Sequence, residues 1–221
     1  MSSQLHSELK KEFQLERLIL FSDAVFAIAI TLLVIEIKVP ELPKEGLTDK
    51  KLGEALGHMI PKFIGFFLSF LIIGLYWTIH HRMFGYVVNY TRRLLWLNLI
   101  FLLAVVLMPF STAFYSEYVL RLLKTPLIIY VCNIVLLGGM NFLLWKYVTN
   151  PKYALIEGLG AEEKRYFSFR AIAVPCVFIL TALVYIFVNP KLAVWIPPLI
   201  PLTMRIISRR FKPRVLKKQP L

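Results

Sequence analysis

One acidic residue, Asp23, lies inside a long apolar segment near the start of the chain. An ionised carboxylate at mid-bilayer costs about 2.5–3.5 kcal/mol on insertion scales, so an acid in a membrane span marks function by default. Trp77 and His80 lie at the end of a second apolar segment, and indole and imidazole N–H groups are suitable donors to a carboxylate. If the two segments are antiparallel neighbours, these donors lie beside Ser22 and Asp23. The pattern predicts a hydrogen-bond network and leaves open whether Asp23 serves structure or gating.

A stripe of apolar residues follows Asp23 on the same segment. Its four members are spaced i, i+3, i+4 and i+7, and they are Ile28, Thr31, Leu32 and Ile35. At 100° per residue the four share one helix face, and Asp23 lies about 140° away from it. If Asp23 faces neighbouring helices of the same chain, the stripe therefore faces away from them. Spacing alone leaves two interpretations: contact with lipid or another helix, or the wall of a pore made of apolar rings and one threonine ring.

The elements that carry these residues are membrane spans. The 221 residues are 58% hydrophobic and only 18% charged, whereas soluble domains carry about 25% charged residues. Six apolar blocks stand near the length of about 20 residues that a helix needs to cross a bilayer, at approximately 18–35, 63–79, 94–113, 126–145, 171–188 and 192–207. We expect an all-α integral membrane protein with six transmembrane helices, forming one domain over residues 1–221. The last block contains Pro197, Pro198 and Pro201, which predict a kink or break.

The chain is strongly basic, with 26 Lys and Arg residues against 13 Asp and Glu and a net charge of +13. Most of the basic residues lie in the two terminal tails and in the connections after the second and fourth blocks. The positive-inside rule therefore predicts a multi-pass protein of the cell membrane with both termini in the cytoplasm and contact with anionic lipid there. Nucleic-acid binding is not expected. Cys132 and Cys176 lie within apolar blocks and are predicted to be buried free thiols.

No residue set indicates catalysis or a bound cofactor. The His80–His81 pair has no acid or thiol at ligand spacing and no accompanying nucleophile, so we expect no metal, no cofactor and no enzyme activity. A proton-coupled secondary transporter using Asp23 and His80 is the alternative to a passive channel. Two features speak against it: only one acid is evident within the spans, and no inverted repeat is apparent.

The chain resembles the transmembrane protein 175 family of potassium channels. The resemblance is carried by Arg17-x-x-x-Phe21-Ser22-Asp23 with the stripe that follows, by Trp77-x-x-His80, and by Asn98 with Met108-Pro109-Phe110. It implies a single-repeat prokaryotic member in which a homotetramer surrounds the ion path with its four first helices. The implied function is a passive potassium channel with modest selectivity over sodium. Without a Thr-Val-Gly-Tyr-Gly loop, selectivity would come from a narrow apolar neck.

The same resemblance implies a role for each motif residue. The constriction falls on Ile28, further hydrophobic layers fall on Leu32 and Ile35, and the residue implicated in ion preference is Thr31. The implied hydrogen-bond network between the first and second spans consists of Arg17, Phe21, Ser22, Asp23, Trp77 and His80.

Overall fold

Helices form every long element of the computed structural model, which describes residues 2–43 and 47–211. The α-helices are α1 (Ser2–Ile35), α2 (Asp49–His58), α3 (Ile60–Phe84), α4 (Arg92–Val106), α5 (Met108–Tyr118), α6 (Lys124–Val148), α7 (Ala161–Phe187), α8 (Pro190–Ala193) and α9 (Ile200–Phe211). Short 3₁₀ turns are η1 (Val119–Arg121), η2 (Pro151–Tyr153) and η3 (Pro197–Leu199). The described residues contain no β-strand, only a single bridge between Val87 and Ile156. The all-α prediction is confirmed.

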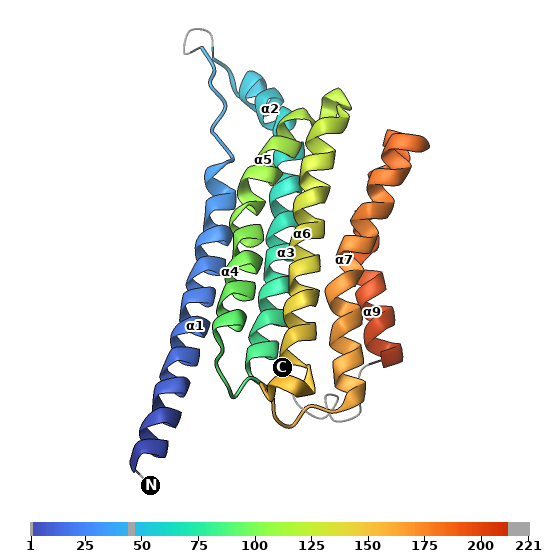
Figure 1. Cartoon of the computed structure of the whole chain (residues 1–221). Helices are drawn as coiled ribbons and strands as arrows, with labels where there is room; N and C mark the ends of the chain where they lie inside the picture. Colours follow the sequence, from blue (N-terminus) through green and yellow to red (C-terminus); the bar gives the residue numbers. More distant parts are fainter. Residues whose placement is uncertain (1, 44–46, 212–221) are drawn as a thin grey trace.

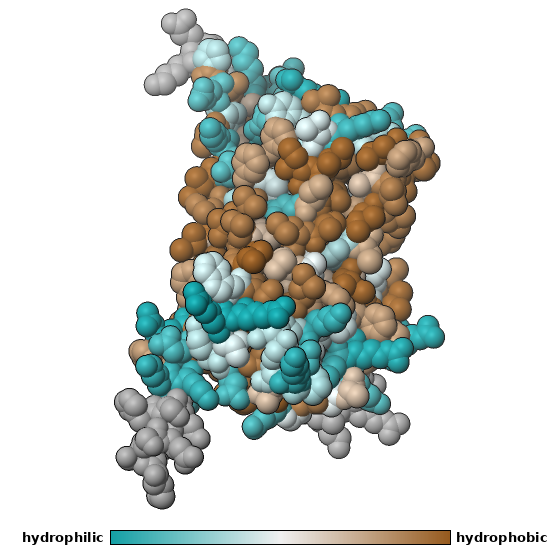
Figure 2. Space-filling view, in the orientation of Figure 1, coloured by the Kyte–Doolittle hydropathy of each residue, from teal (hydrophilic) through white to brown (hydrophobic). Residues whose placement is uncertain are grey.

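Within the described residues, six helical stretches are long and apolar enough to cross a membrane, as predicted. They run over Lys10–Ile35, Ile60–Phe84, Arg92–Arg121, Lys124–Val148, Ala161–Phe187 and Pro190–Phe211. On the face shown in Figure 2, an apolar band crosses the middle of the molecule, with hydrophilic surface at both ends. The helices extend beyond the predicted blocks because hydropathy detects only their apolar part. The first turn of α7, for example, carries Glu162 and Glu163, and its polar turns precede the block predicted to start at residue 171.

The spans form an elongated bundle in which α1 and α9 lie at opposite edges (Figure 1). α1 packs against α3, α4 and α5, whereas α6 packs against α4, α5 and α7, and α9 packs against α7. The start of α1, the connection 85–91, the connection 149–160 and the end of α9 lie at one end of the bundle, and α2 lies at the other. Because the number of spans is even, the start of α1 and the end of α9 lie at the same end of the bundle.

Proline residues break or bend three of the spans. The third span is interrupted at Leu107, between α4 and α5, with Pro109 in the first turn of α5, and the sixth is divided into α8, η3 and α9 as its prolines predicted. Pro175 lies inside α7 and has no N–H for the carbonyl of Ala171. The Tyr76 hydroxyl of α3 donates to that carbonyl at 3.2 Å, so the freed acceptor keeps a partner.

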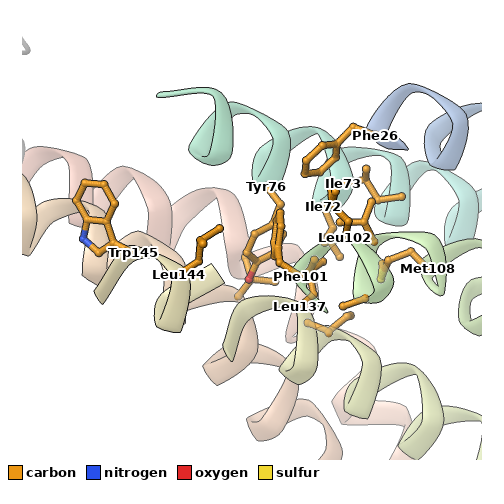
Figure 3. Packing of buried hydrophobic residues seen from close by; sticks show 14 of the residues in the cluster. Phe26, Ile72, Ile73, Tyr76, Phe101, Leu102, Met108, Leu137, Leu144 and Trp145 are labelled. Atoms are coloured by element: carbon orange, nitrogen blue, oxygen red, sulfur yellow. The ribbon is translucent and has the colours of Figure 1, made fainter. Parts of the chain in front are cut away.

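The core lies where α3, α4 and α6 meet α1 and α7. Figure 3 shows Phe26 of α1 and Tyr76 of α3 among the side chains that fill it, together with Phe101 of α4 and Leu137 of α6. The prediction for the two cysteines is wrong in one respect. Cys132 and Cys176 are free thiols, but both are exposed because they lie on outward faces of α6 and α7.

Candidate functional site

The first helix has two sharply different faces. Its buried side chains recur at helical spacing and are Leu15, Leu18, Ser22, Phe26, Ala29 and Leu33. On the other side, Ile28 is 57% exposed, Leu32 is 37% exposed and Ile35 is 66% exposed. Thr31 is exposed between them, and its hydroxyl donates to the Ile28 carbonyl at 2.9 Å within the same helix. The predicted stripe is therefore not covered by any other part of the described chain.

A buried hydrogen-bond chain joins α1, α3 and α4 at Asn98. The Asn98 side-chain Nδ2 donates to Ser22 Oγ at 2.8 Å, and Ser22 Oγ donates to the Leu18 carbonyl at 2.7 Å. On its other side, Asn98 Oδ1 lies 2.8 Å from His80 Nε2. Asn98 and Ser22 are fully buried and His80 is 1% exposed, so all three act without competition from water.

The direction of these bonds follows from proton counting. A serine hydroxyl has one proton, and Ser22 uses it on the Leu18 carbonyl, so its oxygen accepts from Asn98 Nδ2. The amide oxygen of Asn98 then faces His80 and can only accept. His80 Nε2 must therefore carry a proton. The imidazole is held in place by three aromatic rings, with centroid distances of 5.6 Å to Phe26, 4.3 Å to Phe84 and 5.5 Å to Phe101.

A second contact lies at the border of the same helix interface. Trp77 Nε1 donates to Asp23 Oδ1 at 2.9 Å. Asp23 is half-buried and Trp77 is 39% exposed, so this pair lies nearer the surface of the isolated chain than the Asn98 chain does. The Trp77 ring also lies against His81, with centroids 5.5 Å apart. The carboxylate of the first span is thus held by an indole N–H, a donor that carries no charge.

The other two motif residues lie outside these contacts. The guanidinium of Arg17 lies 5.7 Å from the centroid of the Phe13 ring, one turn earlier on α1. Phe21 is 50% exposed on the outer side of α1. Ser22 and His80 are linked through Asn98, and Asp23 and Trp77 are linked directly, but Asp23 has no hydrogen bond to His80 among the contacts of the described residues.

Sequence reasoning gave Asn98 no part in the network, although it is the residue that joins three helices. The available signal was its position, because Asn98 is the only polar residue in the Leu94–Val106 part of α4. A second polar cluster was not predicted at all. Thr112 Oγ1 donates to Ser69 Oγ at 2.7 Å, and Ser69 Oγ lies 2.8 Å from the Tyr130 hydroxyl. This cluster ties α3, α5 and α6 together in the half of the bundle that contains α5.

The fold and the site define the class of protein: a multi-pass membrane protein whose first helix presents an uncovered apolar stripe. The family described as "Endosomal/lysosomal potassium channel TMEM175" matches residues 17–109, which include the second half of α1, all of α3 and α4, and both hydrogen-bonded groups around Ser22 and Asp23. A potassium channel from Streptomyces collinus is 46% identical over 98 residues, which cover 44% of this chain and 46% of that protein. A potassium channel from Chamaesiphon minutus is 37% identical over 114 residues, covering 52% of this chain and 55% of that protein.

The likeness in three dimensions covers more of the chain. The crystal structure of a lysosomal potassium-selective channel TMEM175 homolog from Chamaesiphon minutus has a TM-score of 0.72 and 26% identity, covering 90% of this chain and 99% of that one. The sequence matches, in contrast, span about half the length of the two bacterial relatives. The chain is thus similar to TMEM175 potassium channels in sequence over residues 17–109 and in fold over most of its length.

Proposed function

We propose that this chain is the subunit of a passive potassium channel. The observation that carries the proposal is the exposed apolar stripe of α1, which lies within residues 17–109, the part of the chain that is similar to potassium channels. Sequence similarity supports it, since both bacterial relatives described above are named potassium channels. None of the relatives described above is named a transporter, and Asp23 and His80 bond to different partners, so the transporter is not proposed.

Four copies of the chain would place four α1 stripes around a central path, with both termini in the cytoplasm of a cell membrane. Ile28, Leu32 and Ile35 then form successive apolar rings, and Thr31 contributes a ring of hydroxyls. A narrow apolar neck favours the cation that gives up its hydration shell more readily, which is potassium over sodium. The same neck stops conducting ions when its apolar rings expel water, that is, when it dewets. Such a channel needs no enzyme chemistry.

In this proposal the buried contacts fix the rotation of α1. Ser22 bonds to Asn98 on one side of the helix, while Ile28 points to the other side. Any rotation of α1 that moves the stripe out of the path also breaks the Ser22–Asn98 bond. The network is thus a positioning device for the pore wall and lies outside the ion path.

The direct test is the reversal potential of purified protein in a planar bilayer, with potassium on one side and sodium on the other. A current that reverses toward the potassium equilibrium potential supports the proposal. Flux that appears only under a proton gradient contradicts it.

The pore assignment itself is tested by Ile28→Asn. An amide in the narrowest ring holds water in the neck, so single-channel conductance should rise and the reversal potential should move toward zero. Leu180→Asn is the matched control, because Leu180 is 51% exposed on α7, a helix far from α1 (Figure 1). Unchanged currents in Ile28→Asn, or equal changes in both variants, would remove Ile28 from the ion path.

A further inference from the structure

The seam between α7 and α9 is held by aromatic and hydroxyl contacts near the end of the bundle where α1 begins. The Phe169 ring of α7 stacks on the Phe211 ring of α9, with centroids 4.6 Å apart and planes 29° apart. One turn away, the Tyr166 hydroxyl lies 3.2 Å from Ser208 Oγ. These contacts give the last turn of α9 a defined place beside the first turns of α7.

Arginine side chains gather around these rings. The guanidinium of Arg165 lies 5.7 Å from the centroid of Phe169 and 5.8 Å from that of Phe211, and the guanidinium of Arg210 lies 6.0 Å from the same Phe211 ring. Two positive groups therefore share one aromatic ring. Arg170 is held against Tyr166 of the same seam, with its Nη1 donating to the Tyr166 hydroxyl at 3.4 Å.

No carboxylate forms an ion pair with this cluster within the described part of the chain. The one ion pair there joins Lys62 to Glu117 at the opposite end of the bundle. The nearby Glu163 carboxylate is engaged by the backbone N–H of Gly160 at 2.8 Å. Arg165 and Arg210 are exposed and have no hydrogen bond to the described residues, so most of their N–H donors remain available. Like charges held together without a counter-ion attract an external anion.

The surface beside the cluster is apolar and faces away from the bundle. Leu199 is 48% exposed, Leu202 is 53% exposed and Ile206 is 52% exposed. Their spacing places them on one face of the η3–α9 stretch, and Arg209 continues that face one turn later. Since α9 packs against α7 at the edge of the bundle opposite α1, this face lies far from the stripe assigned to the pore (Figure 1).

We propose that the α7–α9 seam binds the phosphate of an anionic phospholipid through Arg165, Arg209 and Arg210, with an acyl chain along Leu202 and Ile206. The planar guanidinium can bind two phosphate oxygens at once, which an isolated ammonium cannot do. The apolar face leading up to the arginines fits a lipid better than a soluble anion. The site does not depend on the proposed channel activity, and its test needs no current.

The experiment measures the binding of dioleoylphosphatidylglycerol to the purified full chain in detergent by native mass spectrometry. Dioleoylphosphatidylcholine, which has the same acyl chains, is the reference lipid. The test variant replaces Arg165, Arg209 and Arg210 by Gln. The control variant replaces Lys10, Lys11 and Arg92 by Gln, which removes the same charge from exposed positions at the same end but away from the seam. Inorganic phosphate is added in a separate arm.

We expect the test variant to bind phosphatidylglycerol at least tenfold more weakly than the wild type, with little change in the control variant or for phosphatidylcholine. If the triple variant does not fold, Arg209→Gln alone should weaken binding about fivefold, because one arginine near an anionic surface contributes about that much. Arg209 is exposed and holds no contact of the seam. Equal losses in test and control variants, or no loss in either, overturn the site. If millimolar phosphate displaces the lipid, the ligand of this site is a soluble anion and the lipid proposal is rejected.

Discussion

Replacing Asn98 by Leu should destabilise the protein, because Asn98 is the only side chain that bonds to both α1 and α3 in the buried chain. The variant loses the bond to Ser22 and the bond to His80. The Ser22 hydroxyl still donates to the Leu18 carbonyl, so the loss of the Asn98–Ser22 bond costs little. His80 Nε2–H, in contrast, is left without an acceptor inside three aromatic rings.

The size of the effect follows from these two losses. A side-chain hydrogen bond between membrane helices contributes about 0.6 kcal/mol on average and about 1.7 kcal/mol at most. A buried donor without a partner costs about 1–3 kcal/mol. We expect a loss of about 2–3 kcal/mol in the free energy of unfolding. For a chain of this size that corresponds to a fall of about 4–12 °C in the unfolding midpoint.

Asn141→Leu is the matched control for this substitution. Asn141 is as fully buried as Asn98, yet neither of its side-chain amide atoms has a hydrogen-bond partner among the described residues. Removing an amide that is buried without partners should leave stability unchanged or raise it by up to about 2 kcal/mol. The two variants make the same chemical change at the same burial, so their difference isolates the network.

The assay is thermal unfolding of the purified proteins in one detergent, followed by intrinsic fluorescence. The result that refutes the reasoning is a loss in Asn141→Leu equal to or larger than the loss in Asn98→Leu. The Ser22→Ala and Asn98→Leu double variant adds a further condition. Its loss should be smaller than the sum of the two single losses, since both variants remove the same bond.

Two further substitutions test the packing of the bundle and the second contact of α1. Gly138→Ala should destabilise the protein by about 1–3 kcal/mol, because the added Cβ would lie 2.6 Å from the Tyr76 hydroxyl and 2.8 Å from Pro175 Cδ. Gly139→Ala is the control: its Cβ would have no atom within 4 Å, so it should be neutral or mildly stabilising in the same thermal assay. Trp77→Phe removes the indole N–H that donates to Asp23 and should cost about 0.5–1.5 kcal/mol. Trp96→Phe, a control at an exposed tryptophan of α4, should cost less, and equal losses would mean that the Asp23 contact contributes nothing.

The membrane architecture was predictable because it depends on a one-dimensional property. A run of apolar residues long enough to cross a bilayer is visible without knowledge of any neighbour, and all six spans were found. The ends of the helices were harder to predict from the sequence. α5 continues through the polar Glu117 to Tyr118, beyond the predicted end at residue 113, because helix formation does not stop where hydropathy falls. The break at Leu107 was also missed, although Pro109 indicates it in retrospect.

The partners of buried polar groups were harder to predict than the spans. That Asp23 would meet a donor near the end of α3 followed from antiparallel packing, and the Trp77 contact agrees with that expectation. The partner of His80 required knowledge of a third helix. Asn98 lies 18 residues further along the chain from His80, and only the packing of α4 between its neighbours places the two groups at the same depth. The residue spacing within the second span does not indicate which residue of another helix lies opposite His80.

The two features of α1 on which the proposed channel depends have a single structural origin. A helix that buries Ser22 against Asn98 also buries Phe26 and Ala29, since these residues share one face. The opposite face must then carry Ile28 and Ile35 away from the bundle. An uncovered apolar stripe and a satisfied polar network are therefore two consequences of one helix rotation, and a substitution that releases the network releases the stripe as well. The stripe is visible in the sequence as a pattern, but the side of the molecule on which it lies is decided by the polar contacts behind it.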